Sequence, residues 1–333
     1  MKRVRKYLSM LLVGIVTLSL TGCIVQRTEE SKSKTVLAKV GDKKITRGDL
    51  DKFMYYYLNQ YEQSYGEDFE ENEDLKDTLK EQRTSALETL VQQEVLLQKQ
   101  DEIGAEFTDE EIKEMVDEQI SSIKESYPDD EYVEYIATYG YTEKEFEEYL
   151  TVQAKLTKIL DKMLEDVTVS DDEIKEYYDE NVSSYVLEPG AYVKHILFTD
   201  ETTGEVDAKA ARELVLQGKT FEEIAEMDEY KDKCQTSDLG HQVFEDNANL
   251  VTEFVDGFKN LPEGEVSEPV KTSYGWHLII NTKVNKEEVT QTLDEVKDSI
   301  SNTLLNEKKS SEFDSRIEKL EKEMEVKIYT DRF

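Results

Sequence analysis

Few residues in this chain have side chains that commonly carry out chemistry. Among its 333 residues are two cysteines, Cys23 and Cys234, and three histidines, His195, His241 and His277. They are scattered, and no Cys-x-x-Cys or His-Glu-x-x-His spacing brings metal ligands together. We therefore expect no metal ion and no other cofactor.

The first cysteine ends a segment that is typical of an export signal. Residues 2–6 (KRVRK) are basic, residues 8–20 (LSMLLVGIVTLSL) are apolar, and Leu-Thr-Gly-Cys follows at 20–23. This order predicts a signal peptide over residues 1–22, and the apolar run is short for a permanent membrane helix. Leu-Thr-Gly-Cys resembles a bacterial lipobox, which implies that the thiol of Cys23 accepts a lipid and anchors the protein to a membrane.

Two other interpretations of this segment are an uncleaved anchor and ordinary cleavage next to an incidental cysteine. The lipobox spacing disfavours both. In either case residues 23–35 are mostly polar and predict a flexible tether. Because Cys23 belongs to the processing motif, Cys234 has no partner and we expect no disulfide framework.

The chain is strongly acidic, with a formal net charge of −35. Removing residues 1–22 removes four basic side chains, so the mature chain carries −35 − 4 = −39. A field of this sign repels nucleic acid and favours cationic partners, but simple solubility is the favoured explanation of the charge. With 38% hydrophobic and 9% aromatic residues, the composition is not that of a disordered chain.

Between the tether and residue 186 the chain is predicted to be mainly helical. Residues 36–45 (VLAKVGDKKI) alternate around Gly-Asp and predict a small hairpin. Capping boxes, in which Ser or Thr is followed three residues later by Glu, predict helix starts at Thr108, Thr142 and Ser170.

One predicted helix carries a stripe of aromatic residues at four-residue spacing, Phe53, Tyr57, Tyr61 and Tyr65. The stripe has two interpretations. It packs in the core, which is the favoured one, or it forms a surface that holds unfolded segments, because Tyr and Met adapt to varied partners.

The composition changes at Glu188-Pro189-Gly190. Residues 187–285 combine strand-like runs with two helical stretches and predict one small α/β domain. Residues 286–333 return to helical spacing and are expected to pack on the N-terminal domain, residues 36–186. The predicted fold is therefore α+β, with a helical domain built from both ends of the chain and a small α/β domain inserted.

Four pieces of the inserted domain occur in an order that resembles a parvulin-type (PpiC or rotamase) peptidyl-prolyl cis/trans isomerase. They are VKHIL at 193–197, GKTFEEIA at 218–225, SDLG at 237–240, and LPEGEVSEPVKT with SYGWHLI at 261–279. The whole layout, from the lipobox to the split helical domain, resembles the PrsA-like foldases of Gram-positive bacteria, which implies a chaperone role for the helical domain.

The resemblance also implies roles for single residues. His195 and His277 correspond to paired histidines on adjacent central strands. The family's proline pocket corresponds to Leu239, Leu250 and Phe254.

Three further residues correspond to polar positions of the family's site. Thr272 and Tyr274 fall at its polar rim. Tyr230 falls ten residues before Gly240, where the family usually has Asp or Cys. Cys234 lies four residues further on and is interpreted as an incidental thiol on a loop.

For the two histidines, a hydrogen-bond network that shapes the site is favoured over direct acid–base chemistry. Isomerisation requires no covalent step, because the barrier of about 18–20 kcal/mol comes from amide resonance. A site need only hold proline and favour the twisted amide over both planar forms.

Three functions remain open. The first is an isomerase and foldase that assists secreted proteins at the outer face of the cytoplasmic membrane. The second is a non-catalytic holdase chaperone with a vestigial parvulin domain, and the third is a structural lipoprotein without clients. The expected partners are unfolded or partly folded secreted proteins and the membrane, through Cys23. Nucleic acid is not expected, and a homodimer is possible.

Overall fold

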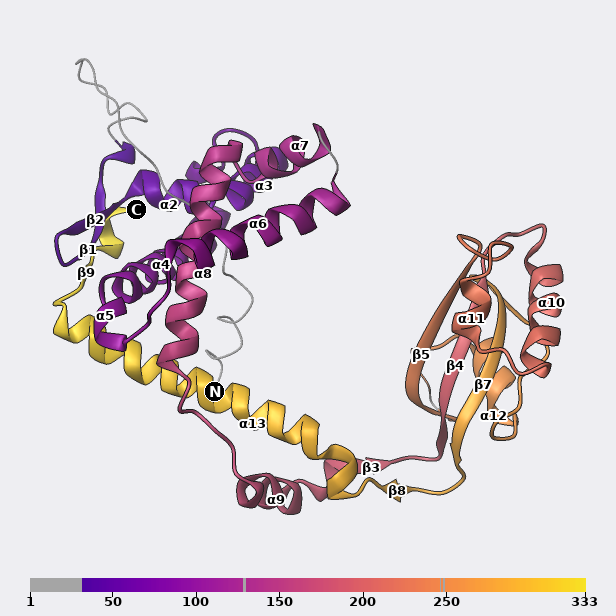
Figure 1. Ribbon diagram of the computed structural model, residues 1–333. Helices are drawn as coiled ribbons and strands as arrows, with labels where there is room; N and C mark the ends of the chain where they lie inside the picture. Colours follow the sequence, from indigo (N-terminus) through magenta and orange to yellow (C-terminus); the bar gives the residue numbers. More distant parts are fainter. Residues whose placement is uncertain (1–31, 128–129, 246, 248) are drawn as a thin grey trace. The chain divides into compact units, whose positions relative to one another are not determined.

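The computed structural model describes residues 32–127, 130–245, 247 and 249–333, which form two units (Figure 1). Unit 1 consists of the described part of residues 1–168 together with 303–333, and unit 2 consists of residues 169–302. The predicted α+β fold is confirmed, because the mainly helical unit is built from both ends of the chain around an inserted α/β unit. The predicted signal peptide, the lipidation site Cys23 and residues 24–31 of the tether lie outside the described residues.

A three-stranded antiparallel sheet joins the two ends of the chain in unit 1, in the order β2-β1-β9. Strands β1 (Val36–Val40) and β2 (Lys43–Thr46) form the predicted hairpin, and β9 (Lys327–Ile328) pairs with β1. Gly41 occupies the turn with φ +55°, a conformation that glycine adopts without strain. The C-terminal strand therefore completes a sheet that the N-terminal hairpin begins.

Two long helices of unit 1 begin at their predicted capping residues. All three predicted capping boxes, at Thr108, Thr142 and Ser170, are present, the last of them in unit 2. The helical elements of unit 1 are α2 (Arg47–Phe53), α3 (Tyr55–Tyr65), η2 (Phe69–Glu71), α4 (Glu73–Gln98), α5 (Gln100–Ile103), α6 (Asp109–Ser126), α7 (Asp130–Thr138), α8 (Glu143–Met163) and the C-terminal part of α13 (Leu293–Glu323).

Two hydrophobic cores stabilise unit 1. The larger one contains Leu37 of β1, Val91 of α4 and Ile159 of α8, all fully buried, and α13 adds Ile317 and Leu320. The smaller one lies between α6, α7 and α8 and is rich in aromatic residues, namely Tyr132, Tyr141, Phe146 and Tyr149.

The aromatic stripe of the predicted helix is divided. The helix ends at Phe53 and a new one begins at Tyr55, with Met54 buried between them. Phe53 packs against both cores, whereas Tyr57 and Tyr65 are exposed. The core interpretation therefore holds for the start of the stripe and not for its end.

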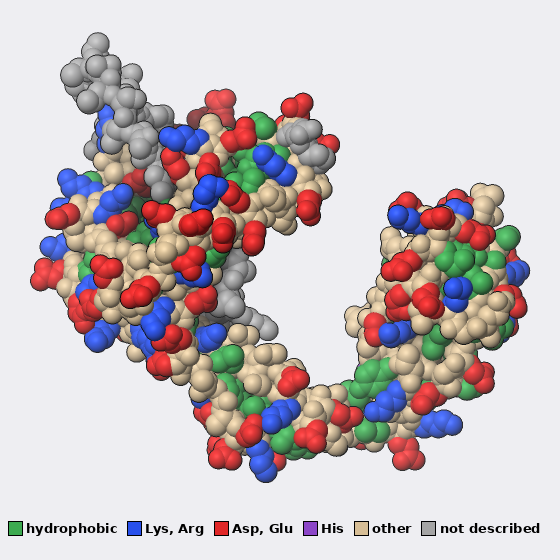
Figure 2. Space-filling model, in the orientation of Figure 1, with side chains coloured by type: hydrophobic (Ala, Val, Ile, Leu, Met, Phe, Trp, Pro, Cys, Tyr) green, Lys and Arg blue, Asp and Glu red, His purple; other side chains and the backbone are tan. Residues whose placement is uncertain are grey.

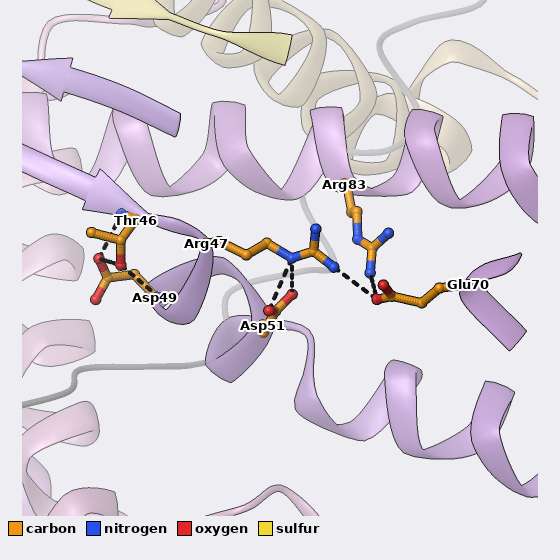
Figure 3. Close-up of polar contacts among 6 residues, drawn as sticks. All are labelled: Thr46, Arg47, Asp49, Asp51, Glu70 and Arg83. Atoms are coloured by element: carbon orange, nitrogen blue, oxygen red, sulfur yellow. Dashed lines mark hydrogen bonds and ion pairs between the residues drawn. The ribbon is translucent and has the colours of Figure 1, made fainter. Parts of the chain in front are cut away.

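A cluster of ion pairs around two buried arginines connects α2, η2 and α4 (Figure 3). Arg47 of α2 donates through Nε to both carboxylate oxygens of Asp51, at 2.7 and 2.9 Å, and through Nη2 to Glu70 Oε1 at 2.7 Å. Arg83 of α4 contacts the same oxygen of Glu70. Burial alone would raise the pKa of Glu70, but the guanidinium groups of Arg83 and Arg47 outweigh it, so this pKa lies below its usual value.

Unit 2 contains a four-stranded antiparallel sheet in the order β5-β4-β7-β6. Its strands are β4 (Gly190–Phe198), β5 (Cys234–Val243), β6 (Val270–Thr272) and β7 (Gly275–Asn285). Helices α10 (Gly204–Leu216), α11 (Phe221–Ala225) and α12 (Thr252–Lys259) pack on this sheet.

The alternation along β4 separates two cores on the two faces of this sheet. Ile196 and Phe198 pack with residues of α10 and α11 on one face. Ala191 and Val193 pack with Phe254 and Phe258 of α12 on the other.

The boundary between the units differs from the expected one. Residues 169–186 belong to unit 2, not to the N-terminal domain, and the C-terminal part of unit 1 begins at 303 rather than 286. The reason is that hydrogen bonds connect α9 (Asp171–Glu180) and η3 (Val182–Tyr185) to the segment after β7. Tyr178 Oη donates to Gln291 O at 2.7 Å, and Gln291 N donates to Tyr185 O at 2.9 Å. A two-stranded sheet of β3 (Val186–Leu187) and β8 (Val289–Thr290) completes this connection.

No helix in the described part of the chain combines the length and the apolar character that crossing a membrane requires.

We expect Glu70→Gln to lower the free energy of unfolding of unit 1 by about 2 kcal/mol, because it leaves the buried Arg83 unpaired and Arg47 with Asp51 alone. Chemical denaturation followed by far-UV circular dichroism measures this change. The matched control is Glu71→Gln, since Glu71 is exposed and makes no ion pair among the described residues. Equal stability of the two variants would contradict the prediction.

Candidate active site

Two histidines on adjacent strands form the centre of the candidate site. In the β4–β7 register, His195 lies opposite Ile279 and His277 lies opposite Leu197, so the histidines are diagonal neighbours on one face of the sheet. Their Nδ1 atoms are 3.1 Å apart and their ring centroids 5.2 Å apart. The two imidazoles are therefore hydrogen-bonded to each other, with one Nδ1 as donor and the other as acceptor.

Thr272 determines which imidazole donates. Its Oγ1 lies 2.9 Å from His277 Nε2 and accepts a hydrogen bond from the backbone N–H of Tyr274 at 3.0 Å. The Thr272 side chain is buried, and the described residues offer its hydroxyl proton no acceptor other than His277 Nε2. His277 then carries its proton on Nδ1 and donates to His195, and His195 keeps its own proton on Nε2.

Both imidazoles are neutral near pH 7. Burial lowers the pKa of His277 to about 4, with smaller contributions from His195 and Lys271. Burial also lowers the pKa of His195 below its usual value. The hydrogen bond excludes a doubly charged pair, because two protonated Nδ1 atoms would face each other without an acceptor.

An apolar cluster lies against the histidine pair. Phe254 of α12 is 3% exposed, and its ring centroid lies 5.2 Å from that of His195 and 5.0 Å from that of His277, nearly perpendicular to both. Leu239 and Leu250 pack, partly buried, in the same cluster. The structure therefore brings the three residues expected to line a proline pocket together with the two histidines.

Close packing of α12 on the sheet positions Phe254. A Cβ atom on Gly257 would lie 2.7 Å from Val270 and 3.1 Å from Ile279, so only glycine allows this approach. Asn281, fully buried on the same face of β7, donates to Phe258 O and Leu261 O, both at 2.8 Å. Asn281 is a positioning residue that sequence reasoning missed. The signal in the sequence was an Asn directly after the apolar residues 278–280 of a predicted strand.

Two of the expected polar residues are not part of this cluster through their side chains. Tyr230 lies in the core on the opposite face of the sheet, 2% exposed, with its ring 5.9 Å from that of Phe198. We therefore assign Tyr230 to the core rather than to the site. Tyr274 contributes its backbone N–H, while its side chain is 67% exposed.

Cys234 begins strand β5 and is not on a loop as expected. Its thiol contacts Tyr230 O at 3.5 Å, and burial raises the pKa of this thiol, which keeps it protonated. A protonated thiol is a poor nucleophile.

The polar residue beside His195 is Ser237, which sequence reasoning missed. Ser237 lies directly opposite His195 in the β4–β5 register, so both side chains project from the same face of the sheet. The signal was the two-residue period of a strand, because Ser237 precedes the pocket residue Leu239 by two positions.

The depressed pKa of His277 predicts that unit 2 loses stability as the pH falls from about 6.5 to about 4. In this range the unfolded chain binds a proton on His277 that the folded chain excludes, so unfolding is favoured by falling pH. Between pH 7 and pH 5 the loss is on the order of 1–2 kcal/mol. Fluorescence of Trp276, the single tryptophan of the chain, reports the unfolding of unit 2.

Other groups titrate in the same range, so the comparison is with a His277→Gln variant. We expect the variant to show a pH dependence that is smaller by this amount. An unchanged pH dependence would show that His277 is not held neutral by burial.

Comparison with known proteins places this geometry in a family. The model of the PPIC-type PPIase domain matches residues 169–298, and that of the SurA-like N-terminal domain matches residues 1–160. The chain is 32% identical to the foldase protein PrsA of Clostridium perfringens strain 13, over 100% of this chain and 97% of that protein. It is 34% identical to the PrsA of Clostridium botulinum strain Langeland, over 99% and 98%.

Among solved structures, PrsA from Bacillus subtilis is 24% identical, with a TM-score of 0.37, over 87% of this chain and 93% of that one. PrsA from Lactococcus lactis is 17% identical, with a TM-score of 0.39, over 88% and 94%. Because the relatives that are more than 30% identical extend over the whole chain, the chain belongs to the PrsA foldase family and carries a parvulin-type peptidyl-prolyl isomerase domain.

Proposed function

We propose that the protein catalyses cis/trans isomerisation of Xaa-Pro bonds and so assists the folding of secreted proteins at the outer face of the cytoplasmic membrane. The observation that supports this most directly is the hydrogen-bonded, neutral His195–His277 pair in contact with Phe254. Membership of the PrsA foldase family supports the role in folding.

The arrangement suits a reaction in which no bond to the protein forms. Amide resonance creates a barrier of about 18–20 kcal/mol, and it is lost when the amide twists. Leu239, Leu250 and Phe254 provide an apolar surface for the prolyl ring, which removes water from the amide. An amide nitrogen that leaves resonance regains a lone pair, which an N–H donor can stabilise.

The hydrogen-bond chain from Thr272 through His277 to His195 supplies such a donor. It leaves His195 with a proton on Nε2, an atom without a partner among the described residues. The histidines therefore act by orienting and donating, not by transferring a proton. Ser237 lies directly opposite His195, and the exposed Tyr274 follows Thr272 by two residues, which supports a role for both at the rim of the site.

The direct test is the rate of isomerisation of an unstructured Xaa-Pro tetrapeptide by the full chain. We expect His277→Ala to lower kcat/KM on the order of 10²-fold, because it removes the group that orients His195. Thr272→Val removes one hydroxyl at nearly constant volume and should lower kcat/KM about tenfold. The matched control is His241→Ala, since His241 contacts Tyr192 and not the pair.

A wild-type rate no faster than the uncatalysed rate in buffer would contradict the proposed isomerase function. The second candidate, a holdase, would then remain, and the exposed tyrosines of α3 favour it. It requires that the full chain suppresses aggregation of an unfolded protein and that His277→Ala suppresses it equally well.

We also propose that the thiol of Cys23 carries the lipid that anchors the protein at the membrane. The lipobox spacing of residues 20–23 supports this. In cells grown with labelled palmitate, we expect the wild-type chain to be labelled and to sediment with membranes. The Cys23→Ser variant should be unlabelled and lost from the membrane fraction, whereas Cys234→Ser should behave as wild type. Membrane retention of Cys23→Ser would argue for an uncleaved anchor.

A further inference from the structure

Five tyrosines of unit 1 form a continuous chain of ring contacts, which we call the tyrosine surface. Tyr57 contacts Tyr56 with centroids 5.6 Å apart, and Tyr56 stacks on Tyr139 at 5.2 Å. Tyr139 contacts Tyr135 at 5.3 Å, and Tyr135 stacks on Tyr127 at 4.5 Å. The five residues come from α3, from the end of α6, and from α7 with the residue that follows it.

The tyrosine surface is open to solvent. Tyr56, Tyr57 and Tyr127 are 38%, 46% and 40% exposed, and Tyr135 and Tyr139 are half-buried. Helix α3 has no buried residue at all. Isolated exposed tyrosines are ordinary, but a contiguous aromatic surface of this extent is typical of a binding surface.

Contacts beneath the tyrosine surface hold α3 in place. Lys52, just before α3, donates to Gly140 O and lies 4.8 Å from the ring centroid of Tyr141. A Cβ atom on Gly140 would lie 2.7 Å from the ring of Tyr55, so the ring packs directly on the backbone of the turn after α7. Because these rings are positioned before any partner arrives, binding costs little ordering of the surface.

Acidic side chains are numerous on the part of unit 1 that contains α3 and α7 (Figure 2). Residues 55–65, 124–127 and 130–139 contain five carboxylates and one cation. The cation, Lys124, lies over the ring of Tyr132, 4.6 Å from its centroid. The carboxylates are those of Glu62, Glu125, Asp130, Glu131 and Glu134.

Exposed tyrosine rings and neighbouring carboxylates together favour a cationic partner. Tyrosine faces attract cations, and a guanidinium group both stacks on an aromatic ring and pairs with a carboxylate. Anionic partners such as nucleic acid are repelled. A second copy of this chain is a poor partner as well, because a two-fold interface would bring the carboxylates of both copies together.

We infer that the tyrosine surface binds extended, arginine-containing segments of unfolded chains. This inference rests on the proposed role of the protein in assisting unfolded clients, and it assigns that role a place in unit 1. Four ring contacts of about 5 Å each span at most roughly 20 Å, which is the length of about six residues in an extended chain. An unfolded segment exposes its arginine side chains on both sides, so recognition needs no single sequence.

The test uses the full chain and a fluorescent, unstructured peptide in which arginine alternates with leucine, with binding followed by anisotropy. We expect binding that weakens with salt, and about tenfold weaker binding by the double variant Tyr56→Ala, Tyr139→Ala. The double variant Tyr56→Phe, Tyr139→Phe keeps the rings and should bind nearly as well as wild type. The matched control is Tyr65→Ala, which lies on the same helix, 55% exposed, outside the tyrosine surface.

Two further peptides test whether the charge of the partner matters. A peptide with glutamate in place of arginine should not bind, and one with lysine should bind less tightly than the arginine peptide. If the alanine variant does not fold, as judged by circular dichroism, the double variant Glu131→Gln, Glu134→Gln takes its place. Both glutamates are exposed, and their neutralisation should weaken binding several-fold without affecting the fold.

Equal binding of the arginine and glutamate peptides, or wild-type binding by both the alanine and the glutamine variants, would overturn the inference. So would a change in sedimentation of the alanine variant with unchanged peptide binding, because the tyrosines would then form an interface between copies. Tetrapeptide isomerisation separates this inference from the proposed isomerase. We expect the tyrosine variants to retain it, and His277→Ala to lose it while binding the arginine peptide normally.

Discussion

The antiparallel pairing of β4 with β7 is the constraint on which the rest of unit 2 depends. Its register makes His195 and His277 diagonal neighbours, and the period of two along each strand separates their face from the core beneath α10 and α11. A shift of β7 by one residue would turn His277 away from His195 and Phe254. The same two strands lead into β3 and β8, so the two connections to this sheet also run side by side.

The histidine pair could be inferred from the sequence, because the motifs around it are dense and correspond position by position to a known family. The apolar cluster of Leu239, Leu250 and Phe254 could be inferred for the same reason. Tyr230 could not be placed in this way. Between α11 and β5 the chain forms an irregular turn in which Asp232 has φ +67°, so counting residues back from Gly240 does not follow the strand. The register of β5, and not the count, identifies Ser237 as the neighbour of His195.

In unit 1, local sequence signals predicted where helices begin, but not which segments the helices contact. The capping boxes at Thr108 and Thr142 are satisfied within four residues, so they are readable from the sequence. The break at Met54 is not readable, because it results from packing, with Met54 buried while the backbone changes direction. Likewise, Glu70 joins Arg47 and Arg83 across 23 and 13 residues, and no sequence pattern specifies contacts of that kind.

Aromatic residues serve two different purposes in the two units, and the difference lies in their burial. Phe254 is almost inaccessible and is fixed by Gly257 and Asn281, which suits a site that must distinguish one imino-acid ring in one geometry. Tyr56 and Tyr57 are exposed, and their hydroxyl groups keep them hydrated in the absence of a partner. Such rings bind many sequences weakly, because stacking and charge attraction need little shape complementarity. A foldase that assists diverse clients would use both properties, and here they are divided between a rigid apolar cluster beside the histidines and a broad, acidic aromatic surface.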